Sequence, residues 1–151
     1  MSISSPATTV ICEDAILEGP ITFGPDNVIH PKCVIRSEGG GEIVFGRGNI
    51  VEESAVIVNR SYLLPNAFEG SSVGTGCTIE ARANVSVGTT LGDNSVIGAK
   101  CHTRPNQIVP NDTVIFGESH TTRTQNKSNR LQANLHSRHL EYLREVPVLA
   151  L

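Results

Sequence analysis

The chain has 151 residues, which suits one domain with one core. Its 12 basic and 15 acidic residues nearly cancel, which argues against a nucleic-acid partner and against attraction to an anionic membrane. Aromatic residues are few and Trp is absent, which favours a repetitive stack of short strands over a conventional core with aromatic bulk.

The N-terminal residues contain neither the basic stretch nor the apolar stretch of a secretory signal. No apolar run approaches the roughly 20 residues needed to span a bilayer. The cysteines lack the C-x-x-C spacing of metal or redox motifs; they are Cys12, Cys33, Cys77 and Cys101. We therefore expect a cytoplasmic chain with reduced thiols and no membrane insertion.

From Ile11 to Ile115, a large apolar residue recurs every six positions, with one break after Ile35 and another after Ile57. Thr103 is the polar exception. Two residues before most of these positions stands a small or turn-tolerant residue, and Gly or Glu often follows directly. The repeated positions are Ile11, Leu17, Phe23, Ile29, Ile35, Phe45, Val51, Ile57, Val73, Ile79, Val85, Leu91, Ile97, Thr103, Val109 and Ile115.

This hexapeptide repeat predicts a parallel β-helix over residues 1–117. Alternate residues of a strand point the same way, so the large residue and the small residue two before it both face inward. Gly and Asn suit the corners, where the backbone needs positive φ. Three hexads close one triangular coil, so the repeat makes about five coils stacked at the strand spacing. We predict an all-β, left-handed parallel β-helix, with the hand taken from other hexapeptide β-helices.

The two breaks in the repeat predict loops that leave the prism at 36–44 and 59–72. The second loop carries Tyr62, Leu63, Leu64 and Phe68. An apolar loop that protrudes from a prism is a candidate protein-interaction surface. The sequence equally allows this loop to fold back over its own β-helix.

Residues 118–127 form a polar linker, and 128–146 have helical periodicity. Ser128 suits the N-cap and Pro147 ends the segment. We predict a C-terminal α-helix that packs on a side of the prism. Its apolar residues, further candidates for protein interaction, are Leu131, Leu135, Tyr142 and Val146 on one stripe, with Leu143 beside it.

Two enzyme classes use this repeat, acyltransferases and γ-class carbonic anhydrases, and both are alternatives to a non-catalytic protein. The zinc site of the carbonic anhydrases needs three histidines, two of them five residues apart. No such pair exists among His30, His102, His120, His136 and His139. His102 and His120 lie 18 residues apart, which is one coil, but no third ligand is evident.

The residues also argue against acyl transfer, because no Trp is present to clamp a cofactor and His30 falls at a corner. Cys33, Cys77 and Cys101 occupy inward small-residue positions, where a thiol behaves as a compact hydrophobe. We therefore predict no catalytic residue, no metal site and no cofactor.

Three stretches resemble the dynactin subunit six family beyond the generic repeat. They are Thr22–Lys32, Gly48–Asn59 with its Glu52-Glu53-Ser54-Ala55 run, and Asn111–Gly117. The loop after Asn59 and the C-terminal helix also fall where that family has them. In this chain the loop is shorter and less acidic, and the C-terminal tail is short.

This resemblance implies a non-catalytic structural subunit of the dynactin pointed-end complex, cytoplasmic and associated with the cytoskeleton. Such a subunit supports the attachment of cargo to dynein–dynactin in microtubule-based transport. The partners it implies are the sister β-helical pointed-end subunit as a heterodimer, the larger pointed-end subunit, and the actin-related protein at the filament end.

Overall fold

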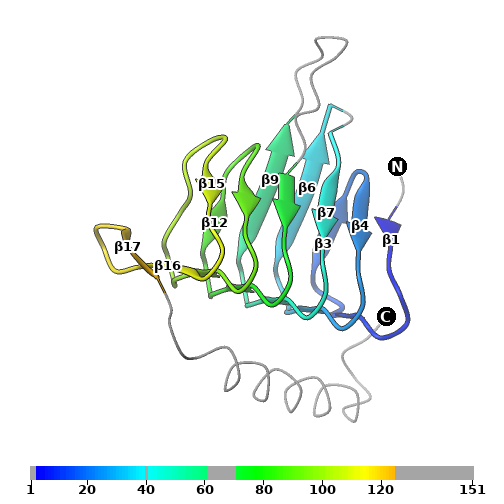
Figure 1. Cartoon of the computed structure of the whole chain (residues 1–151). Helices are drawn as coiled ribbons and strands as arrows, with labels where there is room; N and C mark the ends of the chain where they lie inside the picture. Colours follow the sequence, from blue (N-terminus) through cyan, green and yellow to red (C-terminus); the bar gives the residue numbers. More distant parts are fainter. Residues whose placement is uncertain (1–2, 40, 61–70, 125–151) are drawn as a thin grey trace.

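The computed structural model describes residues 3–39, 41–60 and 71–124. These residues form a parallel β-solenoid of about five turns, whose short strands line the three walls of a prism (Figure 1). The all-β parallel β-helix predicted from the repeat is confirmed. Within the described ranges there is no helix, and hence none long and apolar enough to cross a membrane.

We name the three walls by their first strands, and all but one of the strands are parallel to their neighbours. Face 1 consists, in spatial order, of β1 (Ile3–Ser4), β4 (Ile21–Phe23), β7 (Ile43–Phe45), β10 (Ser71–Val73), β13 (Thr90–Leu91) and β15 (Ile108–Val109). Face 2 consists of β2 (Val10–Ile11), β5 (Val28–Ile29), β8 (Ile50–Val51), β11 (Thr78–Ile79), β14 (Val96–Ile97), β16 (Thr113–Phe116) and β17 (Thr121–Thr124). Face 3 consists of β3 (Ile16–Glu18), β6 (Val34–Glu38), β9 (Val56–Arg60) and β12 (Asn84–Val85), and a bridge from Asn84 to His102 extends it.

The core fills the prism with the side chains that the repeat places inside. All sixteen repeat positions are buried except Ile11 and Leu17, which are partly buried. These two residues belong to the first turn, which has a neighbouring turn on one side only. Phe23 and Phe45 stack on adjacent turns with ring centroids 4.7 Å apart. Burial of each large aliphatic side chain contributes about 1.5–3 kcal/mol, so the repeat itself supplies most of the driving force.

The corners need a left-handed backbone at the same place in each turn. Between face 1 and face 2, φ is positive at Asp26, Gly48, Gly76, Asn94 and Asp112. Gly adopts this conformation without strain, and Asn and Asp tolerate it better than other residues do. The predicted role of Gly and Asn at corners therefore holds here. The corner between faces 2 and 3 departs from it and uses Lys32, Ser54, Arg82 and Lys100.

The described solenoid extends past both ends of the predicted repeat. At the N-terminus β1 pairs with β4, although Ser5, six residues before Ile11, breaks the apolar pattern. At the other end, the segment expected to be linker contains β17, which pairs antiparallel with β16. Gly117 and His120, both with positive φ, turn the chain back between these strands.

The two excursions between turns are shorter than the sequence suggested. β6 continues to Glu38 and β9 to Arg60, because Glu38 and Arg60 still pair in register on face 3. β6 and β9 both run up to the corner where face 3 passes to face 1, at the top of Figure 1. The predicted helix over 128–146 lies outside the described residues.

Candidate interaction surfaces

The residues predicted to contact other proteins lie outside the described ranges. Tyr62, Leu63, Leu64 and Phe68 fall within 61–70, and Leu131, Leu135, Tyr142, Leu143 and Val146 fall within 125–151. The structure describes the points where these segments leave the prism: between β9 and β10, and after β17.

The stem of the 61–70 excursion is fixed by buried polar groups. Oγ of Ser71 donates to Oδ1 of Asn59 over 3.1 Å, and both residues are buried. The backbone N–H of Gly88, one turn further on, lies within hydrogen-bond distance of Oδ1 of Asn59 and Oγ of Ser71, at 3.2 and 3.1 Å. Any surface carried by the excursion therefore starts from a rigid base.

The excursion after β6 leaves the prism beside it, one turn earlier. Ser37 pairs in register with Asn59, and Ser37 Oγ donates to the carbonyl of Gly41. β6 and β9 thus end side by side at the corner between faces 3 and 1.

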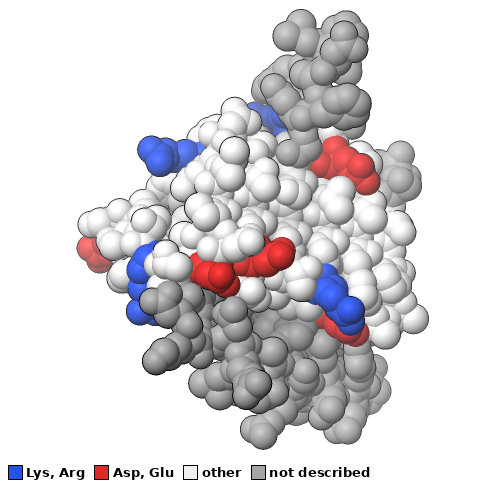
Figure 2. All heavy atoms as spheres, viewed as in Figure 1, with Lys and Arg blue, Asp and Glu red and all other residues white. Residues whose placement is uncertain are grey.

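Face 1 has a flat, uncharged outer side. The outward residues of its strands pair into one column along the prism: Ser4, Thr22, Val44, Ser72, Thr90 and Ile108. Val44 is 41% exposed and Ile108 75%. In Figure 2 the surface over β4, β7 and β15 is mostly uncharged, and the charged side chains lie toward its margins. The repeat could have revealed this column, since each member directly precedes an inward position.

Several charged residues on the described surface pair with the opposite sign across neighbouring turns. On face 3, Nε of Arg36 lies 2.7 Å from Oε2 of Glu18, and Nε of Arg60 lies 3.0 Å from Oε2 of Glu38. Such exposed pairs contribute little to stability, typically below about 1 kcal/mol each. They reduce the net charge of this face, in keeping with the balanced composition.

The Glu52-Glu53 run, which resembles the family pattern, has a structural role. Oε2 of Glu52 accepts a hydrogen bond of 3.2 Å from the backbone N–H of Ala81, one turn further on. Glu53 lies 3.9 Å from Nζ of Lys32. Burial and the nearby carboxylate of Glu52 raise the pKa of Glu80.

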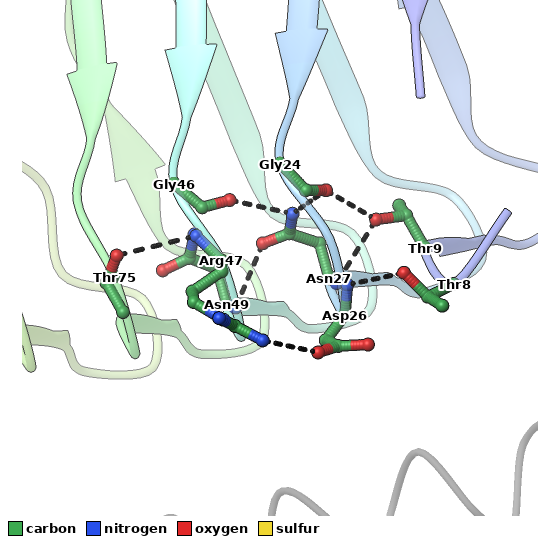
Figure 3. Close-up of polar contacts among 9 residues, drawn as sticks. All are labelled: Thr8, Thr9, Gly24, Asp26, Asn27, Gly46, Arg47, Asn49 and Thr75. Atoms are coloured by element: carbon green, nitrogen blue, oxygen red, sulfur yellow. Dashed lines mark hydrogen bonds and ion pairs between the residues drawn. The ribbon is translucent and has the colours of Figure 1, made fainter. Parts of the chain in front are cut away.

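At the corner between faces 1 and 2, a ladder of polar side chains ties the turns together (Figure 3). Nδ2 of Asn27 donates to the carbonyls of Gly24 and Gly46 over 2.8 and 2.9 Å. Oδ1 of Asn27 accepts from the N–H of Asn49, and Oδ1 of Asn49 accepts from the N–H of Cys77. These polar groups therefore serve the fold and are not available to a substrate.

The one histidine pair that the sequence singled out does come together. The rings of His102 and His120 meet edge to face with centroids 4.0 Å apart. The chain does not reach His120 by a further parallel coil, as the 18-residue spacing assumed, but through the turn before β17. Among the described residues, no group of three His, Cys, Asp or Glu side chains is placed to hold a metal ion.

All four thiols are buried, including that of Cys12, which lies outside the inward small-residue register. Burial raises the pKa of every one of them, to about 11 for Cys33 and Cys77. A thiol that stays protonated at neutral pH is a poor nucleophile and a poor metal ligand.

No protein-family model matches the chain. Among individual proteins, it is 31% identical to "Dynactin subunit 6" of Danio rerio over 147 residues, covering 82% of this chain and 75% of that protein. It is 32% identical to the protein of the same name from Xenopus tropicalis, covering 77% and 68%.

A solved structure of a hexapeptide transferase family protein from Anaplasma phagocytophilum shares the fold. Its TM-score is 0.71 at 18% identity, over 94% of this chain and 91% of that one. At that identity the likeness concerns the fold alone. The identities to the two curated relatives, which extend over most of each chain, show that this chain belongs to the dynactin subunit 6 family.

Proposed function

We propose that this chain is a non-catalytic structural subunit of dynactin and that it works in the pointed-end complex. The observation that carries the proposal is the similarity to proteins named Dynactin subunit 6, which spans most of both chains. In this role the protein is cytoplasmic, associates with the cytoskeleton and supports the attachment of cargo to dynein–dynactin.

The proposed mechanism is the docking of a rigid prism. Parallel turns joined by buried side-chain hydrogen bonds keep the walls straight, so a partner meets a preformed surface and little conformational entropy is lost on binding. The uncharged outer side of face 1 suits a partner with an equally flat and uncharged wall. The proposed partners are the sister β-helical pointed-end subunit, the larger pointed-end subunit and the terminal actin-related protein.

Two further features belong to the proposal. The coils are left-handed, as in other hexapeptide β-helices. Residues 128–146 form an α-helix. The contact residues we propose are Tyr62, Leu63, Leu64 and Phe68 in the excursion, and Leu131, Leu135, Tyr142, Leu143 and Val146 in the helix.

Native mass determination of the purified chain tests the proposal, first alone and then with the sister β-helical subunit. The metal content is read on the same sample. We expect a metal-free monomer that forms a one-to-one complex with the sister subunit. A matched variant, Val44→Asp with Ile108→Asp, places two charges on the outer side of face 1 and should weaken that complex without unfolding the prism.

A zinc-loaded homotrimer that ignores the sister subunit would contradict the proposal. It would favour the alternative, a hexapeptide-repeat enzyme of the acyltransferase or γ-carbonic-anhydrase type. In that case His102 and His120 are the first residues to substitute, because their rings are already in contact.

A further inference from the structure

We propose that the N-terminal end of the prism is a docking surface for a partner protein that adds its own β-edge there and carries Lys or Arg beside that edge. The end is formed by the first turn, drawn in blue in Figure 1, with strands β1, β2 and β3. Each of these three strands has a described neighbour on one side only. The proposal adds a second docking surface to face 1, the wall that the proposed function assigns to a flat partner.

The backbone of the first turn presents hydrogen-bonding groups at this end. The N–H groups of Val10, Cys12 and Ile16 donate to carbonyls of the second turn over 2.8, 2.9 and 2.8 Å. Neighbouring N–H groups along a strand point to opposite edges, so those of Ile11 and Leu17 point away from the second turn, to a side where no described strand lies. An added strand would meet the same pattern of donors and acceptors that joins the turns.

Apolar side chains of the interior are exposed at the same end. Ile3 pairs with Ile21 and belongs to the same inward column, yet Ile3 is 46% exposed and Ile21 is 0% exposed. Ile11 and Leu17 are only partly buried, whereas Ile29, the residue above Ile11 in the second turn, is fully buried. Contact between water and an apolar interior is unfavourable, so a partner that covers this end gains free energy by removing it.

The other end of the prism is closed within the described part of the chain. Val109 and Ile115, inward residues of the last turn, are each 2% exposed. β17 pairs antiparallel with β16 and so occupies the edge of face 2 at that end. Two copies of the chain therefore cannot join head to tail by continuing all three walls, and the β-edge has to come from another protein.

The rim of the open end is acidic. Glu13 and Asp14 are both exposed between β2 and β3. The first Lys or Arg of the sequence is Lys32, whose Nζ lies 3.9 Å from Glu53 of the third turn. Two copies of this end would bring like charges together, which disfavours a homodimer at this surface. A partner with Lys or Arg beside its edge has the complementary charge.

These features match the known way in which an exposed sheet edge recognises an extended segment. Main-chain hydrogen bonds supply affinity, and contacts to alternate side chains supply specificity. At this end the apolar interior would favour Val or Ile on one side of the added strand, and the acidic rim would favour Lys or Arg. The partner class is therefore a protein with a free β-edge that alternates apolar and basic residues.

Binding of two short synthetic peptides of equal length to the purified full chain tests the proposal. One probe alternates Val with Lys and the other alternates Val with Glu, and fluorescence anisotropy at low salt measures their affinities. The basic peptide should bind about tenfold or more tightly than the acidic one. Glu13→Lys with Asp14→Lys should remove or invert this preference. The control, Glu53→Lys with Glu118→Lys, changes the net charge equally away from the rim and should retain it.

Equal affinities for the two peptides in the parent chain would overturn the proposal, and so would equal effects of the two double variants. Amide hydrogen exchange then locates the bound strand. Saturation with the basic peptide should slow exchange at the N–H groups of Ile11 and Leu17 about tenfold or more and leave exchange at the opposite end of the prism unchanged. Unchanged exchange at Ile11 and Leu17 would also refute the docking surface.

The same rim variant separates this inference from the proposed function. Glu13→Lys with Asp14→Lys should leave the one-to-one complex with the sister β-helical subunit intact, because that complex is assigned to face 1. Loss of the sister complex in this variant would contradict the assignment of two separate surfaces. Failure of the parent chain to bind the sister subunit would contradict the proposed function alone, because the peptide measurements do not involve that subunit.

Discussion

The backbone N–H of Asn49 donates a hydrogen bond of 2.9 Å to Oδ1 of Asn27, the residue at the same corner of the preceding turn. Both asparagines are buried, at 1% and 0% exposure. The relationship is repeated one turn later, where the N–H of Cys77 donates to Oδ1 of Asn49 over 2.7 Å. Side chains thus supply hydrogen bonds at a corner where the parallel strands have ended, and this keeps successive turns in register.

Asn27→Ala should lower the free energy of unfolding by about 2–4 kcal/mol. The substitution leaves the buried N–H of Asn49 and the part-buried carbonyl of Gly46 without this partner, and each unsatisfied buried group costs roughly 1–3 kcal/mol. Urea denaturation measures the effect. Thr90→Ala on the exposed side of face 1 is the control and should change stability by less than about 0.5 kcal/mol. Equal losses in the two variants would contradict the role given to the ladder.

Gly46→Ala should destabilise the protein by about 1–3 kcal/mol, although its backbone conformation is open to other residues. A Cβ at Gly46 would lie 2.6 Å from the carbonyl oxygen of Gly74 in the next turn, and backbone atoms cannot move aside easily. Thermal unfolding provides the measurement. Ser72→Thr adds a methyl group on the outer side of face 1 and should be neutral. A neutral Gly46→Ala would mean that the turns are less closely stacked at this corner.

The four native thiols should react with a disulfide reagent at least about a hundredfold more slowly in the folded protein than after denaturation. All are buried, and burial raises their pKa values, so thiolate is scarce at neutral pH. The absorbance of the thiolate that the reagent releases gives the number of protein thiols that have reacted. Rapid reaction of even one thiol in the native protein would show that its part of the prism opens readily.

Glu80→Gln should stabilise the protein at pH 7 and have no such effect at pH 4. Burial and the Glu52 carboxylate raise the pKa of Glu80 above its usual 4.5 in the folded state. Between 4.5 and that raised value the folded protein holds more protons than the unfolded chain, so stability falls as the pH rises through this window. The free-energy cost of ionising Glu80 in the folded protein is therefore fully present at neutral pH and absent at a pH well below 4.5.

The melting temperature of Glu80→Gln at pH 7 should exceed that of the parent by on the order of 1–3 °C. Glu53→Gln, an exposed change in the neighbouring turn, is the control and should leave the melting temperature nearly unchanged. The same gain at pH 4 and at pH 7 would mean that ionisation of Glu80 is not its cause.

Local pattern was enough to predict the walls and the interior of the prism. A six-residue period states which residues face inward, and Ile29, Ile57 and Ile97 are fully buried as it requires. It works because the alternation of side chains along a strand is a property of two or three consecutive residues. Where the pattern was weak, it did not mark the strands: β1 lies before the repeat, although within the predicted 1–117, and β17 lies in the polar run after Gly117.

The sequence by itself therefore determined the solenoid, its turns and its family resemblance, all of which depend on spacing along the chain. The tertiary structure alone decided that Ser71 and Asn59 clamp the excursion, that His102 meets His120, and that Val28 is buried while Val44 is exposed. Val28 and Val44 stand at equivalent outward positions, so the period cannot distinguish them. Burial on an outer wall depends on contacts between residues far apart in the sequence, and such non-local contacts leave no mark on a local repeat.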